Sequence, residues 1–280
     1  MAENLLRNYP LVVWNRSREK VAELVGKGAV EASTPAELAA RSEVIVSMLA
    51  TPEVTADVML GRGQYSGIGV LDGVNRGGLV IDMSTNSPQT VELLASMFEG
   101  KGCGFVDAPV MGSVQAAAEA TLTILASGKL GDFEKARPVL EKMGKKVWYL
   151  GDVGKASSLK IIFNLHLWLL TASFSEAFAL AEKAGLDPAK TLEIWNSSNQ
   201  KTYISETKGP KILANDWKAA FTVELAIKDL KLLTEMAERL GFQPLLGNVV
   251  YQLYQACSSL GYGGEDFASI IKVYRFYNMR

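Results

Sequence analysis

The sequence predicts an α/β protein of two domains: a Rossmann-type doubly wound sheet over residues 1–152, then an all-helical domain over residues 153–280. Up to about residue 150, short β-rich runs alternate with helical stretches, which is typical of strand–helix–strand units and a mostly parallel sheet. Beyond Gly154 the periodicity is helical throughout. The chain has 280 residues, 48% of them hydrophobic, which is enough for two cores.

The individual elements follow from these patterns, with Gly and Pro at the breaks. The predicted strands are 11–14, 44–49, 79–84, 105–110, 121–128 and 146–151. The helices predicted between them are 18–27, 53–60, 87–100, 115–120 and 133–143. The helices predicted for the second domain are 156–183, 188–196, 221–240, 246–260 and 266–277.

The amino-acid composition indicates which classes of binding partner to expect. The charges nearly cancel, with 29 basic and 30 acidic residues, so we expect small molecules and other subunits as partners, and neither nucleic acid nor a membrane. Cys103 and Cys257 are too few for a disulfide framework, and no cluster of His, Cys or carboxylates has metal-ligand spacing. We therefore expect no metal and a reducing, cytoplasmic setting.

The most apolar run, IIFNLHLWLLTASF from Ile161, is interrupted by Asn164 and His166. It falls short of the roughly 18 to 20 apolar residues that a membrane-spanning helix needs. The run therefore predicts a buried helix. The first residues, which include Glu3 and Arg7, lack the basic-then-apolar pattern of an export signal, so no export is expected.

Asn15, Arg16 and Ser17 follow the first predicted strand. In a dinucleotide-binding fold, an acidic residue after the second strand hydrogen-bonds the ribose 2′-hydroxyl, whereas an arginine there accommodates a 2′-phosphate. A guanidinium can grip phosphate with parallel hydrogen bonds, and Asn and Ser add neutral donors. The segment thus indicates NADP(H) as the cofactor, and the alternative is a solvated turn arginine.

A Rossmann unit also carries a first strand and a G-x-G-x-x-G turn, roughly 20 to 25 residues before the end of its second strand. Only MAENLLRNY stands before Pro10. GRGQYSGIG (61–69) follows a helix, and GDVGKASS (151–158) lacks the spacing of a phosphate-binding loop. We therefore expect either a truncated sequence or a start methionine placed downstream of this first strand and loop. The alternative is a genuine loss, which would weaken cofactor binding sharply.

Lys160 and Asn164 are four residues apart on the predicted long helix, so they share one helix face. A lysine ammonium in a substrate pocket can stabilise a developing alkoxide and supply its proton. The alternative is a lysine whose stem packs while its head reaches water.

Taken together, these segments resemble the β-hydroxyacid dehydrogenase family, which includes 3-hydroxyisobutyrate dehydrogenases and the glyoxylate and succinic semialdehyde reductases. The resemblance extends across essentially the whole chain. The motifs that carry it are WNRS (14–17), VSML (46–49), DMSTNSP (82–88), FVDAPVMGS (105–113), ATLTILASG (120–128), GDVGKASSLKIIFN (151–164) and FTVELAIKDLKL (221–232).

The resemblance implies roles for single residues. Lys160 is the catalytic lysine, and Asn164 helps to position the lysine and the substrate. Gly112 and Ser113 lie in the segment that grips the substrate carboxylate, with Thr85 near the nicotinamide and the substrate. The implied cofactor contacts are Met48, Leu49, Thr85, Phe221, Lys228 and Asp229, beside Asn15, Arg16 and Ser17.

Met111 departs from the family pattern, which has a serine at this position. A thioether cannot donate a hydrogen bond, so substrate recognition must lean on Gly112 and Ser113 or the substrate must differ. Imine reductases on the same fold can carry a methionine in this region but lack the lysine. Lys160 therefore favours hydroxyacid or aldehyde chemistry.

The expected function is an NADPH-dependent reductase of small aldehydes or keto acids such as glyoxylate or succinic semialdehyde. In reverse it would be a 3-hydroxyacid dehydrogenase, with the lysine as proton donor, and a homodimer or homotetramer is expected. Two alternatives stay open: an imine reductase-like enzyme, and a non-catalytic dehydrogenase-fold scaffold. Asp82 and Asp107 end strands, where a cap or turn role competes with support of a site.

Overall fold

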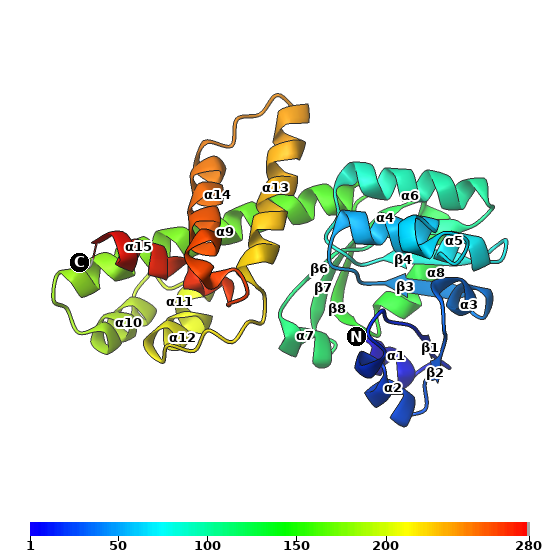
Figure 1. Cartoon of the computed structure of the whole chain (residues 1–280), viewed down its shortest axis with the longest axis horizontal. Coiled ribbons are helices and arrows are strands. Elements are labelled where there is room, and N and C mark those ends of the chain that lie inside the picture. The colour runs from blue at the N-terminus through cyan, green and yellow to red at the C-terminus, as the bar shows by residue number, and fades with distance from the viewer. Residues whose placement is uncertain (279–280) are drawn as a thin grey trace. The chain divides into compact units, whose positions relative to one another are not determined.

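The computed structural model describes residues 1–278. The chain divides into two compact units, Met1–Lys160 (unit 1) and Ile161–Arg280 (unit 2). Within residues 1–278 all the strands lie in unit 1, and unit 2 is built of helices, as the labels in Figure 1 show. The predicted fold class, a Rossmann-type sheet followed by a helical domain, is confirmed.

The main sheet of unit 1 has six strands in the order β3-β4-β5-β7-β6, with β8 beside β7. Its bounds are β3 Val44–Ser47, β4 Leu79–Asp82, β5 Gly104–Asp107, β6 Val110–Met111, β7 Leu122–Gly128 and β8 Gly144–Tyr149. Strands β3, β4 and β5 are parallel and in register, so Ser47, Asp82 and Asp107 lie in one row at their carboxyl ends. That row supports most of the candidate site in this unit.

Three of the five strand pairs in the main sheet are parallel, as predicted, and the two antiparallel pairs both involve β7. Strand β7 is antiparallel to β5 and to β6, and β8 is parallel to β7. The cause is the short connection before β7, whose helix α7 (Val114–Ala118) has five residues and spans about 7.5 Å. That is less than the roughly 13 Å of a four-residue strand, so the chain turns back antiparallel instead of crossing over.

Helices cover both faces of this sheet. The helices on one face are α3 (Pro35–Ala40), α4 (Pro52–Leu60), α5 (Val70–Gly73) and α6 (Pro88–Gly100), and those on the other are α1 (Ala2–Leu6) and α8 (Leu130–Leu140). Neighbouring residues of β4 point to opposite cores: Val80 to the first face, and Ile81 to the second. The sheet is therefore covered by helices on both faces, as in a doubly wound fold.

Helix α6 shows how local sequence fixes an element. Ser87 caps it by accepting a hydrogen bond from the Thr90 N–H at 3.0 Å, and Pro88 occupies its first position. Val91, Leu94 and Phe98 recur at helical spacing and are fully buried against the sheet.

Strands β1 (Val12–Val13) and β2 (Val30–Glu31) form a separate parallel pair, joined through α2 (Ala22–Gly26). Within residues 1–278, β3 pairs only with β4, and a cavity of about 710 Å³ lies between β1 and β3. Both strands turn apolar residues toward it, Val12 and Val13 from one side and Val44 and Ile45 from the other. Among the described residues no strand joins the β1–β2 pair to the main sheet.

Unit 2 is organised around the long helix α9 (Lys155–Lys183), whose first six residues belong to unit 1. Its other helices are α10 (Pro188–Ser197), α11 (Tyr203–Thr207), α12 (Gly209–Leu213), α13 (Val223–Arg239), α14 (Leu245–Cys257) and α15 (Ile271–Asn278). In the described chain, α9 alone has the length and apolar composition of a membrane-crossing helix, and 44% of its most apolar stretch is buried. Trp168, Phe174 and Phe178 from α9 lie in the core of the unit.

Candidate active site

A small pocket lies at the end of β1, where the sequence predicts the cofactor's ribose. Its volume is about 220 Å³, and Asn15 and Arg16 line it. Asn15 donates a hydrogen bond from its side-chain amide to the Ser17 carbonyl at 2.9 Å, which closes the turn after the strand. The Arg16 side chain is exposed at the rim. The structure thus brings Asn15 and Arg16 to this pocket, whereas Ser17 contributes its carbonyl to the turn and does not line the pocket.

Sequence reasoning missed the other walls of this pocket. Trp14 packs edge-to-face on Tyr65, with 5.7 Å between ring centroids, and both line it. Arg18 adds a second guanidinium, which lies 3.5 Å from Glu31 at the end of the neighbouring strand. Parallel neighbouring strands end at the same edge of a sheet, which would place Glu31 beside this turn. Its strand has only two residues, so the sequence shows no β pattern there.

A buried carboxylate organises the ends of β3 and β4. Asp82 is fully buried and accepts hydrogen bonds from the hydroxyls of Ser47 and Ser84, both at 2.7 Å, and from the Asn86 amide at 2.6 Å. The Ser84 hydroxyl in turn accepts from the Leu49 N–H at 2.8 Å. This network fixes the two loops in which Met48, Leu49 and Thr85 are the predicted cofactor residues. Thr85 itself is partly exposed between two fully buried neighbours.

The predicted substrate segment Met111–Ser113 follows β5 and enters α7. Met111 is half-buried in β6, and Gly112 has a φ of +138°, a conformation that favours glycine. A Cβ at Gly112 would come within 2.8 Å of a methyl group of Leu122. The Ser113 hydroxyl accepts from the Ala116 N–H at 3.5 Å and so caps α7.

A second buried carboxylate ties the sheet to the start of α9. Asp107 accepts hydrogen bonds from the Ser157 N–H at 2.9 Å, the Ser157 hydroxyl at 2.8 Å and the Ser127 hydroxyl at 3.1 Å. Lys160, partly buried, follows one turn later on the same helix. Sequence reasoning left the role of Asp107 open because its partner lies 50 residues away.

Burial raises the pKa of Asp107 to about 7. Hydrogen bonds from Ser157 and Ser127 oppose this shift, whereas the neighbouring Asp82 carboxylate adds to it. Burial also raises the pKa of Asp82, against the hydrogen bonds that Ser47, Ser84 and Asn86 donate.

The Asp107 carboxyl gives a testable pH dependence. Its pKa is about 3.9 in an unfolded chain and about 7 when folded, so the unfolded state ionises first as pH rises. The group therefore stabilises the folded protein most below about pH 4. This stabilisation decreases by a few kcal/mol as the pH rises from about 4 to about 7. In urea denaturation, Asp107→Asn should gain stability over wild type between pH 4.5 and pH 8. A constant difference between the two proteins would contradict the raised pKa.

In unit 2 the structure brings together three predicted residues from α9 and α13. Asn164 is buried, and its amide donates to Asp229 Oδ2 at 2.6 Å. The Lys228 ammonium lies 2.9 Å from Asp229 Oδ1. The Asp229 side chain is 1% exposed. A buried carboxylate needs partners, and the Lys228 ammonium and the Asn164 amide supply them. Along α9, Asn164 is one turn beyond Lys160.

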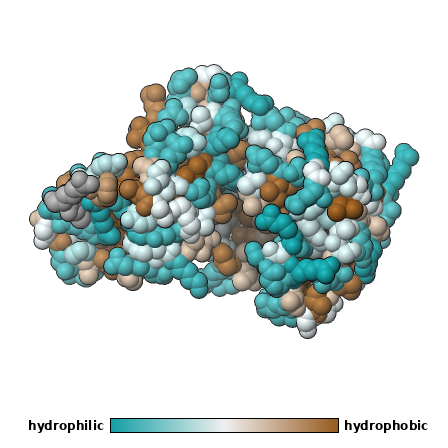
Figure 2. Space-filling view, viewed as in Figure 1, coloured by the Kyte–Doolittle hydropathy of each residue, from teal (hydrophilic) through white to brown (hydrophobic). Residues whose placement is uncertain are grey.

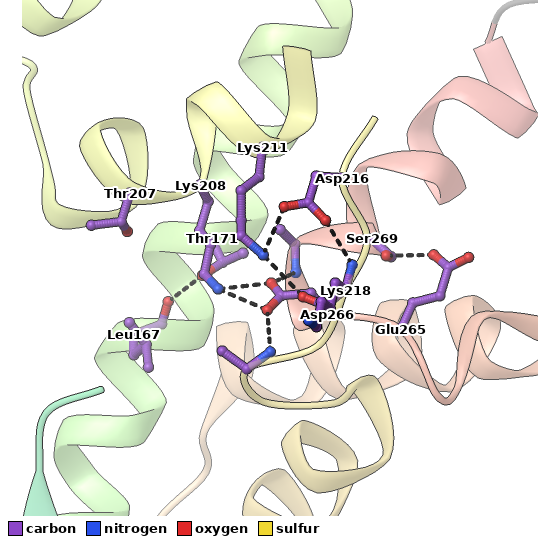
Figure 3. Close-up of polar contacts among 12 residues, drawn as sticks. Leu167, Thr171, Thr207, Lys208, Lys211, Asp216, Lys218, Glu265, Asp266 and Ser269 are labelled. Atoms are coloured by element: carbon purple, nitrogen blue, oxygen red, sulfur yellow. Dashed lines mark hydrogen bonds and ion pairs between the residues drawn. The ribbon is translucent and has the colours of Figure 1, made fainter. Parts of the chain in front are cut away.

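A buried ion pair that sequence reasoning missed lies next to the segment that carries Phe221, the remaining predicted residue. Phe221 packs on Trp168 with 5.5 Å between ring centroids. Asp266 accepts from the Lys208 ammonium at 2.8 and 2.9 Å (Figure 3). It also accepts from the Ala220 N–H, next to Phe221, at 3.2 Å. The ion pair therefore anchors the segment that leads into α13. Within residues 1–278, no group of three or more His, Cys, Asp or Glu side chains could hold a metal ion.

Comparison with known proteins agrees with this architecture. The model of the NAD binding domain of 6-phosphogluconate dehydrogenase matches residues 1–151, and the NAD-binding model of NADP-dependent 3-hydroxyisobutyrate dehydrogenase matches residues 154–274. The fold and these two matches define an NAD(P)-dependent hydroxyacid dehydrogenase or reductase. The chain belongs to the β-hydroxyacid dehydrogenase family.

Its relatives include both reductases and dehydrogenases. The chain is 32% identical over 273 residues to glyoxylate/succinic semialdehyde reductase 2 of Arabidopsis thaliana, covering 97% of this chain and 75% of the relative. It is 34% identical over 283 residues to mouse mitochondrial 3-hydroxyisobutyrate dehydrogenase, covering 98% and 83%. The crystal structure of a 3-hydroxyisobutyrate dehydrogenase from Salmonella typhimurium matches with a TM-score of 0.89 at 25% identity, covering 97% and 94%.

Proposed function

We propose that this protein is an NADPH-dependent reductase of small aldehydes or keto acids, such as glyoxylate or succinic semialdehyde, and that it also runs in reverse as a 3-hydroxyacid dehydrogenase. The observation that carries the proposal is the pair Lys160 and Asn164 on one face of α9, with Asn164 fixed by Asp229. A partly buried lysine on this face can donate the proton that the reduced carbonyl oxygen requires.

The residues at the end of β1 suit a phosphorylated ribose. The pocket is open, and Asn15, Arg16 and Arg18 supply it with side-chain donors. When bound, NADPH would supply the hydride. Arg16 would hold the 2′-phosphate, and Leu49 and Thr85, in the loops that Asp82 organises, would border the cofactor.

The work of the chain's own residues then divides between the two units. Lys160 would hold the proton at its ammonium group and release it to the substrate oxygen. Asn164, held by Asp229, would keep its amide oriented toward the lysine and the substrate. Gly112 and Ser113 would bind the substrate carboxylate, and half-buried Met111 would shape the pocket beside them.

A substrate panel tests the proposal directly. NADPH oxidation should be measured with glyoxylate, succinic semialdehyde and a cyclic imine, and the reverse reaction with 3-hydroxyisobutyrate. Turnover of an aldehyde or of the hydroxyacid supports the proposal. Turnover of the imine alone would assign the chain to imine reduction, which Met111 favours. A folded protein with no turnover would favour a scaffold.

We also propose a homo-oligomer. The surface in Figure 2 is mostly hydrophilic, with hydrophobic residues in separate clusters. Unit 2 exposes the large apolar side chains Ile162, Phe163, Leu180, Leu186, Ile194, Leu245, Leu246 and Val249. Light scattering after size exclusion should give the mass of a dimer or a tetramer.

Arg16→Ala should weaken NADPH binding about 10- to 100-fold, because a charge-assisted hydrogen bond to phosphate contributes about 1.5 to 3 kcal/mol. NADH has no 2′-phosphate, so its affinity should change less than threefold. Calorimetric titration measures both nucleotides. Arg137→Ala is the matched control, since Arg137 is an exposed arginine paired with Glu141 on α8. Equal losses of NADPH and NADH affinity in Arg16→Ala would refute the 2′-phosphate role.

A further inference from the structure

The Asp107 carboxyl has no part in the proposed chemistry, yet it is fully buried and both of its oxygens accept hydrogen bonds. Its Oδ2 accepts from the Ser157 N–H at 2.9 Å and from the Ser127 hydroxyl at 3.1 Å. Its Oδ1 accepts from the Ser157 hydroxyl at 2.8 Å. All these partners lie in unit 1. The carboxyl thus joins the end of β5 to the first turn of α9.

Helix α9 needs such a cap. The first N–H groups of a helix have no partner within it, and a Ser, Thr, Asp or Asn just before the helix usually satisfies them. Here Val153 and Gly154 precede α9, and neither side chain can accept a hydrogen bond. The Ala156 N–H instead donates to the Ser127 hydroxyl at 3.1 Å, and the next N–H donates to Asp107. Side chains from strands β5 and β7 therefore cap the start of α9.

The capped turn is the one that leads to Lys160. Ser157 precedes the lysine by three residues, a rise of about 4.5 Å along the helix. We infer that Asp107 is a positioning residue for Lys160, which it places by fixing the start of α9 on the sheet. This inference rests on the proposed role of Lys160 as proton donor. Because proton transfer depends on hydrogen-bond distance, a small shift of this turn lowers turnover more than it lowers substrate binding.

The neighbouring carboxyl, Asp82, shows that the contact is specific. Asp82 lies opposite Asp107 in the β4–β5 register and is equally buried. Its hydrogen bonds go to Ser47, Ser84 and Asn86, and so to the ends of β3 and β4. Two similar carboxyls therefore support different parts of unit 1, and only Asp107 supports α9.

The test compares Asp107→Ala with Asp107→Asn in the full chain. In Asp107→Ala, kcat for aldehyde reduction should fall about 10- to 100-fold while the aldehyde KM stays within threefold. Asp107→Asn should keep kcat within threefold, because its carbonyl still accepts from Ser157 N–H and its amide can donate to the Ser157 hydroxyl. Hydrogen exchange over residues 154–162 should speed up in the Ala variant, but not in Asp107→Asn or Asp82→Asn.

Two further variants separate positioning from general loss of stability. Met59→Ala empties a fully buried position in the last turn of α4 and should lower the melting temperature with kcat within twofold. Ser127→Ala removes the cap of the Ala156 N–H and should lower kcat about three- to tenfold, which tests the inference even where Asp107→Ala does not fold. Unchanged kcat in Asp107→Ala, or an equal loss in Met59→Ala, would overturn the inference.

Lys160→Ala distinguishes failure of this inference from failure of the proposed function. Full turnover by Lys160→Ala would overturn both. In the Lys160→Ala background, Asp107→Ala should cost less than a further twofold, since Asp107 acts through the lysine. A large additional loss there would show that Asp107 acts elsewhere, and would overturn this inference alone.

Discussion

Lys160→Ala is expected to lower turnover of the aldehyde about 10²- to 10⁴-fold, the usual contribution of a positioned general acid. The affinity for NADPH should stay within a few fold, because the predicted phosphate contacts come from Arg16 and its neighbours. Turnover is followed by the decrease in NADPH absorbance, and affinity by calorimetry. A loss in kcat without a loss in binding is the signature of a group used in the chemical step.

Two lysine variants sharpen this result. Lys155→Ala is the matched control, because Lys155 is an exposed lysine at the start of the same helix, ion-paired with Asp152 at 2.8 Å. It should keep turnover within twofold. Lys160→Arg keeps the positive charge but hardly releases a proton, so it should stay at least tenfold below wild type. Turnover by Lys160→Ala equal to that of Lys155→Ala would refute the lysine's role.

The parts of the fold that could be predicted from sequence are those whose causes are local. Helix α6 carries its cap Ser87, its first-turn Pro88 and its apolar spacing within its own residues, and it was predicted to within one residue. Strand direction is different, because it depends on where the chain returns. The reversal before β7 needs a five-residue helix and a glycine at φ +138°, and the alternation of strands and helices does not reveal either.

The candidate site likewise contains some residues that could be predicted from sequence and some contacts that could not. Asn164, Lys228 and Asp229 were predicted from the family resemblance, and the structure places them in contact. Nothing in that resemblance says that Asp107 caps α9, or that Lys208 anchors the segment before Phe221. The partners in these contacts are 50 and 58 residues apart, so only the folded chain brings them together.

Breaking the buried Lys208–Asp266 ion pair should destabilise unit 2 strongly, because removal of the lysine leaves a buried carboxylate without its counter-charge. The side chains are 8% and 0% exposed, and the ammonium also lies 4.1 Å from the centroid of the Phe267 ring. Lys208→Ala leaves the Asp266 carboxylate buried with only backbone donors, the N–H groups of Ala220 and Ala268. The free energy of unfolding should fall by about 3 to 5 kcal/mol.

Urea denaturation followed by tryptophan fluorescence measures this loss, since Trp168, Trp195 and Trp217 all lie in unit 2. The exposed pair of Lys190 and Glu193 supplies the control, and Lys190→Ala should change stability by less than about 0.5 kcal/mol.

A double variant shows whether charge is the cause. Lys208→Met with Asp266→Leu removes both charges, so it should be more stable than Lys208→Ala, although it leaves the N–H groups of Ala220 and Ala268 without their side-chain acceptor. If the double variant is instead the less stable, the pair contributes mainly through the hydrogen bonds to the backbone before Phe221. A loss below about 1 kcal/mol in Lys208→Ala would mean that water reaches Asp266 and that the segment is anchored by the aromatic contacts of Phe221 with Trp168 and Phe267.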